Sequence, residues 1–198
     1  MAYIIIGLGN PETQYAKTRH NAGRMAVERI AKAESFPDFT LKKAAQALIS
    51  EGSVGGQKVT LVLPNVAMNL SGKVVPSFVK SKPAAKKLLI IRDELDMPLG
   101  TMKMTFGRGS GGHKGAESVM RALKTKDFAQ IKIGISGSTA KGKVKKPGDE
   151  EKVIKHVIGK FKPDEEKVLK KMLDRTAEAT RLFVSDDIEK AMLIANTK

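Results

Sequence analysis

Two of the three histidines in this chain lie in polar, glycine-containing segments that are typical of a catalytic site. His20 follows an apolar run at residues 3–8 and has polar neighbours on both sides, and His113 lies in the glycine-rich segment 107–115. An unperturbed histidine has a pKa of about 6.5, so either ring can accept a proton at neutral pH with little tuning. The two segments together predict one shared site.

A carboxylate follows closely after the most apolar run of the chain, residues 88–91. Asp93 in this position could accept a hydrogen bond from a histidine, fix its tautomer and stabilise the imidazolium. Glu94 and Asp96 lie close by, so the spacing leaves open which acid takes this role. A turn or helix-capping role is the alternative for Asp93.

Two amide side chains and a glycine-rich loop could assist the histidines. Asn10 follows the first predicted strand, and Asn69 could hold a peptide or an attacking water, or could instead cap a helix over 71–81. The backbone N–H groups of residues 107–115 could face a phosphate or a developing oxyanion, although so many glycines also suit a flexible loop.

Common nucleotide-binding and nucleophile signatures are missing. The third glycine of a dinucleotide-binding fingerprint that starts at Gly7 would fall on Glu12, and no Gly-Lys pair stands in a phosphate-loop context. No G-x-S-x-G elbow is present. The chain has no cysteine, which excludes disulfides, thiolate catalysis and Cys-based zinc sites.

The charge balance points to a polyanionic partner. Lys and Arg number 36 against 21 acidic residues, a net charge of +15. Aromatic residues make up only 5%, with no Trp, which argues against base stacking and favours phosphate contacts with folded RNA. The residues that we expect to contact phosphate are Lys103, Arg108, Lys141, Lys143, Lys145 and Lys146.

Hydrophobic periodicity predicts a single α/β domain over residues 1–198, a twisted mixed β-sheet sandwiched between α-helices. We expect strands at 2–8, 46–53, 57–63, 88–91, 102–106 and 130–135, and helices at 22–33, 71–81, from 112–115, from 163 and at 186–195. Residues 136–149 are predicted to form a mobile loop. The helix from Pro163 is expected to bury Val168, Leu169, Met172, Leu173, Thr176, Ala179 and Phe183.

Several of these segments, in order and at matching spacing, resemble the bacterial-type peptidyl-tRNA hydrolase family. They cover residues 7–11, 15–23, 68–72, 93–96, 111–113 and 128–135. The resemblance implies a monomeric esterase, without metal or cofactor, that cleaves the ester between a peptide and the 3′-terminal ribose of a transfer RNA. It also implies a lid near residues 137–150.

The resemblance further implies roles for individual residues. His20 would be the general base for water, oriented by Asp93, while Asn10 and Asn69 would hold the peptide and the ribose end. The cleft would be lined by His113, Tyr15 and Met68.

Three positions or segments depart from the family pattern: Lys114, the second acid of the 93–96 run, which is Glu94, and the C-terminal helix at 191–196. Lys114 is the departure that bears on catalysis. An Asn usually follows the Gly-Gly-His motif, where it positions water or stabilises the oxyanion, and this chain has Lys114 there. A lysine could supply a cationic donor or contact RNA phosphate. The departure keeps a second interpretation open, a splicing-factor-like relative that binds RNA without hydrolysis, which intact His20 and Asp93 oppose.

No apolar run of about 18 residues and no secretory leader are evident, so we expect no membrane partner. The expected location is the cytoplasm, or a mitochondrion or plastid if a transit peptide has been removed.

Overall fold

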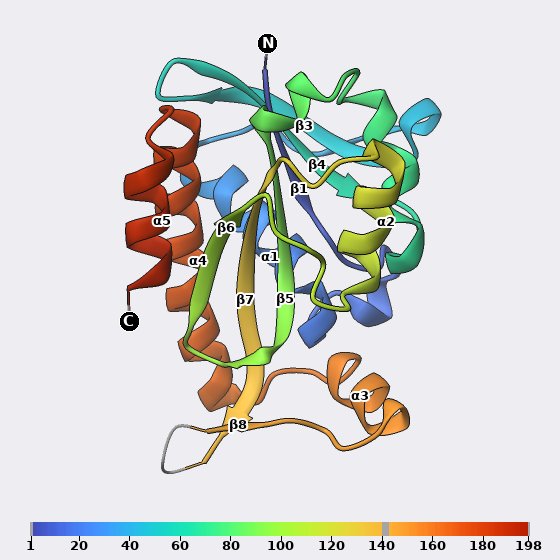
Figure 1. The fold of residues 1–198 in the computed structure, drawn as a ribbon, viewed down its shortest axis with the longest axis vertical. Coiled ribbons are helices and arrows are strands. Elements are labelled where there is room, and N and C mark those ends of the chain that lie inside the picture. The colour runs from blue at the N-terminus through green and yellow to red at the C-terminus, as the bar shows by residue number, and fades with distance from the viewer. Residues whose placement is uncertain (1, 140–142, 198) are drawn as a thin grey trace.

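A mixed β-sheet forms the centre of the molecule in a computed structural model that describes residues 2–139 and 143–197 (Figure 1). The strand order is β2-β3-β4-β1-β5-β7-β6, and β8 pairs with β7. The strands are β1 (Tyr3–Gly7), β2 (Thr40–Lys42), β3 (Ala47–Val54), β4 (Gln57–Pro64), β5 (Leu88–Pro98), β6 (Met102–Phe106), β7 (Ala129–Ser138) and β8 (Val144–Lys145).

The middle of the sheet is parallel and buried on both faces. β1 pairs in parallel with β4 and with β5, and β5 pairs in parallel with β7. Because side chains alternate along a strand, Ile5 packs into the core on one face and Ile6 into the core on the other. This burial explains why β1 and the first four residues of β5 read as continuous apolar runs.

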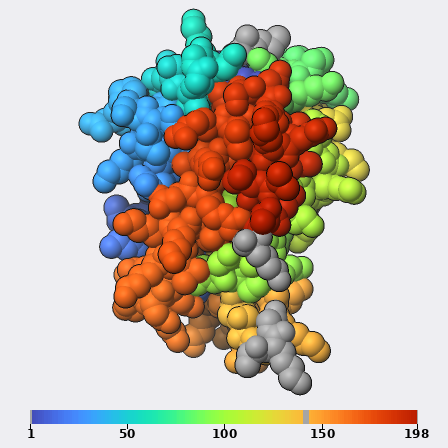
Figure 2. Space-filling view, turned by 90° about the vertical axis from the view of Figure 1, so that its left-hand side faces the viewer, coloured from blue at the N-terminus to red at the C-terminus, as the bar shows by residue number. Residues whose placement is uncertain are grey.

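Helices cover both faces of the sheet, as the periodicity predicts. α1 (Ala22–Ala33), α4 (Pro163–Val184) and α5 (Ile188–Asn196) pack on one face, and α2 (Lys114–Leu123) packs on the other. Figure 2 shows α4 and α5 side by side over a broad part of the surface. None of the helices that the structure describes is long and apolar enough to cross a membrane.

Short 3-10 helices complete the chain: η1 (Thr13–Tyr15), η2 (Arg19–Asn21), η3 (Lys43–Ala45), η4 (Met68–Ser77) and η5 (Pro83–Lys87). The helix predicted over 71–81 is therefore wrong in type and in bounds, since η4 occupies Met68–Ser77. Pro76 lies inside it and has no N–H for an α-helical bond. A side chain on Gly72 would collide with the carbonyl of Ser118, so glycine lets η4 approach α2 closely.

Two further predictions need correction. β5 continues through Asp93 to Pro98, so Asp93 lies within a strand rather than after its end, because β7 continues to pair with β5 there. Val168 is 37% exposed, whereas the neighbouring Leu169 is buried. The other residues expected on that face of α4 are buried or half-buried.

The segment predicted as a loop at 136–149 contains ordered structure. β7 runs to Ser138, and β8 pairs with it antiparallel. α3 (Glu150–Val157), which the sequence patterning missed, then begins after Asp149, whose side chain accepts a hydrogen bond from the Lys152 backbone at 2.8 Å. Residues 140–142, and with them Lys141, lie outside the described residues, and the lid near 137–150 stays a prediction.

Candidate active site

The candidate site lies beyond the carboxyl end of β1 and beside β5, where ligands bind in open α/β sheets. η2 carries His20 into this region and leads directly into α1. A side chain on Gly23, in the first turn of α1, would collide with the carbonyl oxygen of Ile91. Glycine at this position therefore lets α1 close onto β5 and brings His20 over Asp93.

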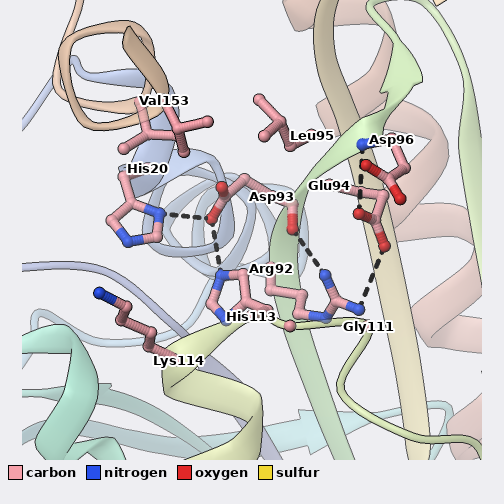
Figure 3. Close-up of a pocket in the computed structure, with 12 residues that line it drawn as sticks. His20, Arg92, Asp93, Glu94, Leu95, Asp96, Gly111, His113, Lys114 and Val153 are labelled. Carbon is pink, nitrogen blue, oxygen red and sulfur yellow. Dashed lines mark hydrogen bonds and ion pairs between the residues drawn. The ribbon is translucent and has the colours of Figure 1, made fainter. Parts of the chain in front are cut away.

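His20 and Asp93 form the first contact of the site (Figure 3). His20 Nδ1 lies 2.9 Å from Asp93 Oδ1, and the Asp93 side chain is only 3% exposed. Because an ionised carboxylate only accepts hydrogen bonds, Nδ1 carries the proton in this contact. The Nε2 nitrogen of His20 is then the lone-pair nitrogen, as a general base requires.

His113 approaches the same carboxylate oxygen from the other side. Its Nε2 lies 2.9 Å from Asp93 Oδ1, while its Nδ1 accepts a 3.2 Å hydrogen bond from the backbone N–H of Ala116. His113 caps the N-terminus of α2 in this way. The cap fixes the tautomer, because Nδ1 must be the acceptor and Nε2 the donor.

Burial and charge shift the three pKa values in different directions. Burial alone would raise the pKa of Asp93, but the two histidines outweigh it and hold this pKa well below its usual range. Burial lowers the pKa of His113, and the charge of Asp93 does not offset it. Burial also lowers the pKa of His20, but the charge and hydrogen bond of Asp93 exceed that effect, so the net shift is upward.

The same three side chains resemble a metal-ligand set, since one ligand atom of each lies within 4.8 Å of the others. A metal ligand must offer a lone pair at the coordinating nitrogen. The Ala116 cap places a proton on Nε2 of His113, at the very atom that would have to coordinate. The cluster therefore fits acid–base chemistry better than metal binding.

A pocket of about 220 Å³ opens above the cluster. Lys114 borders it on the α2 side, and Leu95 from β5 together with Val153 and Val157 from α3 provides an apolar wall (Figure 3). The charge of Lys114 lowers the pKa of His20, although the lysine side chain itself is 70% exposed and lies 3.8 Å from Glu150. The pocket is thus lined both by the basic ring of His20 and by an apolar surface.

Asn10 connects the loop after β1 to the start of η4. Its Oδ1 accepts a 2.9 Å hydrogen bond from the backbone N–H of Met68, and its own backbone exchanges two hydrogen bonds with the Asn21 amide. Within residues 2–139 and 143–197, the side-chain NH₂ of Asn10 has no hydrogen-bond partner. That donor remains available to a ligand.

The other residues expected to bind substrate are spread around this loop. Met68 is buried, and its sulfur lies against Gly115 at the start of α2. Asn69 is exposed in η4, and Tyr15 is half-buried at the end of η1. Of the residues expected to bind substrate, His113 and Lys114 line the pocket above Asp93, whereas Asn10, Tyr15, Met68 and Asn69 do not.

The basic residues separate into two groups. Lys103 and Arg108 line a hollow of about 580 Å³ together with Lys132, near β6. Lys143 and Lys145 lie by the β7–β8 hairpin, and the next residue, Lys146, pairs with Asp96 at 2.6 Å.

Three residues that line the pocket were not identified from the sequence, namely Arg92, Val153 and Val157. Arg92 directly follows the apolar run at residues 88–91 within β5, and a charged residue that continues a buried strand is a signal of a special environment. Val153 and Val157 stand four residues apart, at helical spacing, in the short helix α3 that opens with an acidic pair.

The molecule is thus an α/β protein whose sheet carries a His–Asp–His cluster, with the aspartate buried and the two histidines partly buried, at the edge of a pocket. The family sequence model described as "Peptidyl-tRNA hydrolase" matches residues 4–198. The chain belongs to the peptidyl-tRNA hydrolase family.

Individual relatives agree with this assignment. The chain is 38% identical over 197 residues to the peptidyl-tRNA hydrolase of Herpetosiphon aurantiacus, with 98% of this chain and 90% of the relative covered. It is 35% identical over 199 residues to that of Cytophaga hutchinsonii, with both chains covered completely. The crystal structure of peptidyl-tRNA hydrolase from Acinetobacter baumannii superposes with a TM-score of 0.87 at 32% identity, over 99% of this chain and 95% of the other.

Proposed function

We propose that this protein hydrolyses the ester bond between a peptide, or an N-blocked amino acid, and the 3′ end of transfer RNA. Such an activity recycles transfer RNA from peptidyl-tRNA that ribosomes release prematurely. Membership of the family supports the substrate class. The single observation that carries the chemistry is the 2.9 Å contact between His20 Nδ1 and buried Asp93, because it leaves Nε2 of His20 as a base.

His20 is the general base and Asp93 its orienting partner in this proposal. Nε2 of His20 takes a proton from water while the water oxygen bonds to the ester carbonyl carbon. The negative charge of Asp93 stabilises the imidazolium that forms. The bond between the carbonyl carbon and the ribose 3′ oxygen then breaks, and that oxygen receives the proton from Nε2.

The neighbouring side chains hold the substrate. The free NH₂ group of Asn10 donates to the substrate, and Asn69 contacts the ribose end from its exposed position in η4. In this proposal Tyr15 and Met68 contact the substrate outside the pocket above Asp93, and His113 contacts it within that pocket. The exposed ammonium of Lys114 supplies a cationic donor for the developing oxyanion or for an RNA phosphate.

Basic residues outside the pocket bind the RNA. The net charge of +15 gives the surface long-range attraction for a polyanion. The hollow beside Lys103 and Arg108 is one contact region in this proposal, and Lys143, Lys145 and Lys146 form another, which Lys141 would extend. We further propose that the protein works as a monomer in the cytoplasm.

The test is hydrolysis of a blocked aminoacyl-tRNA by the purified protein. Ester cleavage by the wild type and its loss in His20→Asn, with equal affinity of both for the RNA, is the expected result. Tight RNA binding without any cleavage by the wild type would instead favour an RNA-binding relative that has lost hydrolysis.

A further inference from the structure

Arg92 is the largest fully buried side chain of the described residues, and the hydrolysis step proposed above does not use it. It lies in β5 at the end of the apolar run at residues 88–91 and directly before Asp93. A guanidinium without exposure to water is costly unless all its donors find partners. Its partners therefore indicate what this arginine does.

The guanidinium of Arg92 joins the backbone on both sides of the His–Asp–His cluster. Nη1 donates to the carbonyl of Asp93 at 2.9 Å, and Nη2 donates to the carbonyl of Ser110 at 2.9 Å. Nη2 also lies 3.2 Å from Glu94 Oε2, which balances the charge. One planar group thus connects the strand of Asp93 to the glycine-rich loop that carries His113.

Gln130, also without exposure to solvent, extends this connection from β7. Its Oε1 accepts a 3.3 Å hydrogen bond from Arg92 Nε, and its Nε2 donates to the carbonyl of Arg108 at 2.7 Å. A longer contact of 3.5 Å reaches the carbonyl of Gly109. Two buried side chains therefore hold the carbonyls of three successive loop residues.

Within the described part of the chain, few other hydrogen bonds order the loop: the N–H of Gly107 donates to the Phe128 carbonyl and the N–H of Gly112 donates to Ser110 Oγ, both at 3.3 Å. Gly107, Gly111 and Gly112 adopt positive φ angles of 66°, 61° and 81°. A Cβ atom placed on Gly109 or on Gly112 would meet no atom within 4 Å, so the loop is not packed from that side. Glycine-rich backbone loses much conformational entropy when it is ordered, and the shorter hydrogen bonds from Arg92 and Gln130, at 2.9 and 2.7 Å, offset part of that cost.

The held loop leads directly to His113. The Ser110 carbonyl that accepts from Arg92 also accepts from the backbone N–H of His113 at 3.2 Å. We propose that Arg92 and Gln130 act as a loop clamp, a pair of positioning residues that holds His113 Nε2 at the Asp93 carboxylate and thereby orients the carboxylate that serves His20. The role of the clamp in hydrolysis rests on the proposed function, whereas its hold on His113 does not.

The first pair of variants weakens the clamp without adding a buried charge. Gln130→Met removes both hydrogen bonds to the loop at similar volume, and Arg92→Lys keeps the positive charge next to Glu94 but loses the planar fork. Arg175→Lys is the matched control, because Arg175 donates to the carbonyls of Ile194 and Thr197 at the other side of the fold. All three are expected to lower the melting temperature.

Only the clamp variants are expected to change His113. The chain has three histidines, so each ring can be followed by ¹⁵N NMR in labelled protein. In the wild type and in Arg175→Lys, His113 should show the tautomer with the proton on Nε2 and a pKa below the usual value. In Gln130→Met and Arg92→Lys, we expect mixed tautomers and a pKa closer to the usual value, because the ring leaves its buried position.

The kinetic counterpart is a drop in kcat of roughly 10- to 100-fold in the clamp variants, with KM changed much less, because small displacements of reacting groups cost about this much. Adding Gly109→Ala to Gln130→Met should recover part of kcat, since alanine fits there and stiffens the loop. Unchanged His113 spectra and unchanged kcat in both clamp variants, despite the lower melting temperature, would overturn the clamp. Failure of the wild type to hydrolyse the ester would reject the proposed function alone, because the NMR result would still test the clamp.

Discussion

His20 and Asp93 lie 73 positions apart in the chain, and their side chains meet at 2.9 Å. The contact raises the pKa of His20 against the effect of burial. It also determines which nitrogen of the ring is left with a lone pair. The protonation state of one residue therefore depends on the exact placement of the other, and this dependence can be measured.

Replacement of the base is the most direct test of the mechanism. His20→Ala should lower kcat by roughly 10²- to 10⁴-fold, the usual contribution of a general base. Affinity for the RNA should stay the same, because the ring carries little of the surface charge. Steady-state hydrolysis and a binding assay on the same preparation check both parts, and full activity in the variant would reject the assignment of His20.

Neutralising the carboxylate should move the pH profile. In Asp93→Asn the negative charge disappears while burial persists, so the pKa of His20 should fall below that of the wild type. Because the neutral ring is the active form, the acid limb of the rate profile should shift to lower pH while the maximal rate drops. A profile measured from pH 5 to 9 would show this, and an unshifted acid limb would contradict the contact.

Lys114→Met should move the same limb in the opposite direction. The charge of Lys114 lowers the pKa of His20, so its removal should raise that pKa and shift the acid limb to higher pH. Lys126→Met is a suitable control, since Lys126 is exposed and lies after the far end of α2. Identical profiles for both variants would show that Lys114 does not act on the base.

His113 should make the folded state sensitive to acid. Burial holds its pKa below 6.5, so between that folded value and pH 6.5 the unfolded chain binds more protons and stability falls as the pH falls. His20 has a raised pKa, so its contribution is full below pH 6.5 and is lost as the pH rises through the folded value. We therefore expect the free energy of unfolding, measured in urea from pH 5 to 8, to fall less steeply toward acid pH in His113→Gln than in the wild type. The same slope in both proteins would be inconsistent with a buried neutral ring.

RNA affinity should weaken steeply with salt, because binding releases condensed counterions. Lys103→Met should reduce the slope of log affinity against log salt by about one if this lysine contacts a phosphate. Lys58→Met serves as the control, since Lys58 is exposed at the start of β4. Equal slopes for the wild type, Lys103→Met and Lys58→Met would show that Lys103 does not contact a phosphate.

The sequence alone predicted most of the regular structure. Continuous apolar runs mark β1 and the start of β5 because both faces of the sheet are buried there, alternation marks β7, and helical spacing marks α1 and α4. The prediction failed for η4, where Pro76 excludes an α-helix, and for α3, whose two short turns bury no residue completely. Local patterning is weakest where an element depends on neighbours rather than on its own periodicity.

For the site, the sequence determined the residue types, the family and the presence of two histidines and a carboxylate in motif segments. Spacing alone left open whether Asp93, Glu94 or Asp96 faces the base, and the family resemblance implied Asp93. The tertiary structure shows why His20 contacts this acid: β5 extends past Asp93, side chains alternate along it, and the close approach of α1 brings His20 to Asp93 rather than to the other two acids. The tautomer of His113 and the buried contacts of Arg92 likewise depend on groups distant in sequence, because a hydrogen bond is set by position in space.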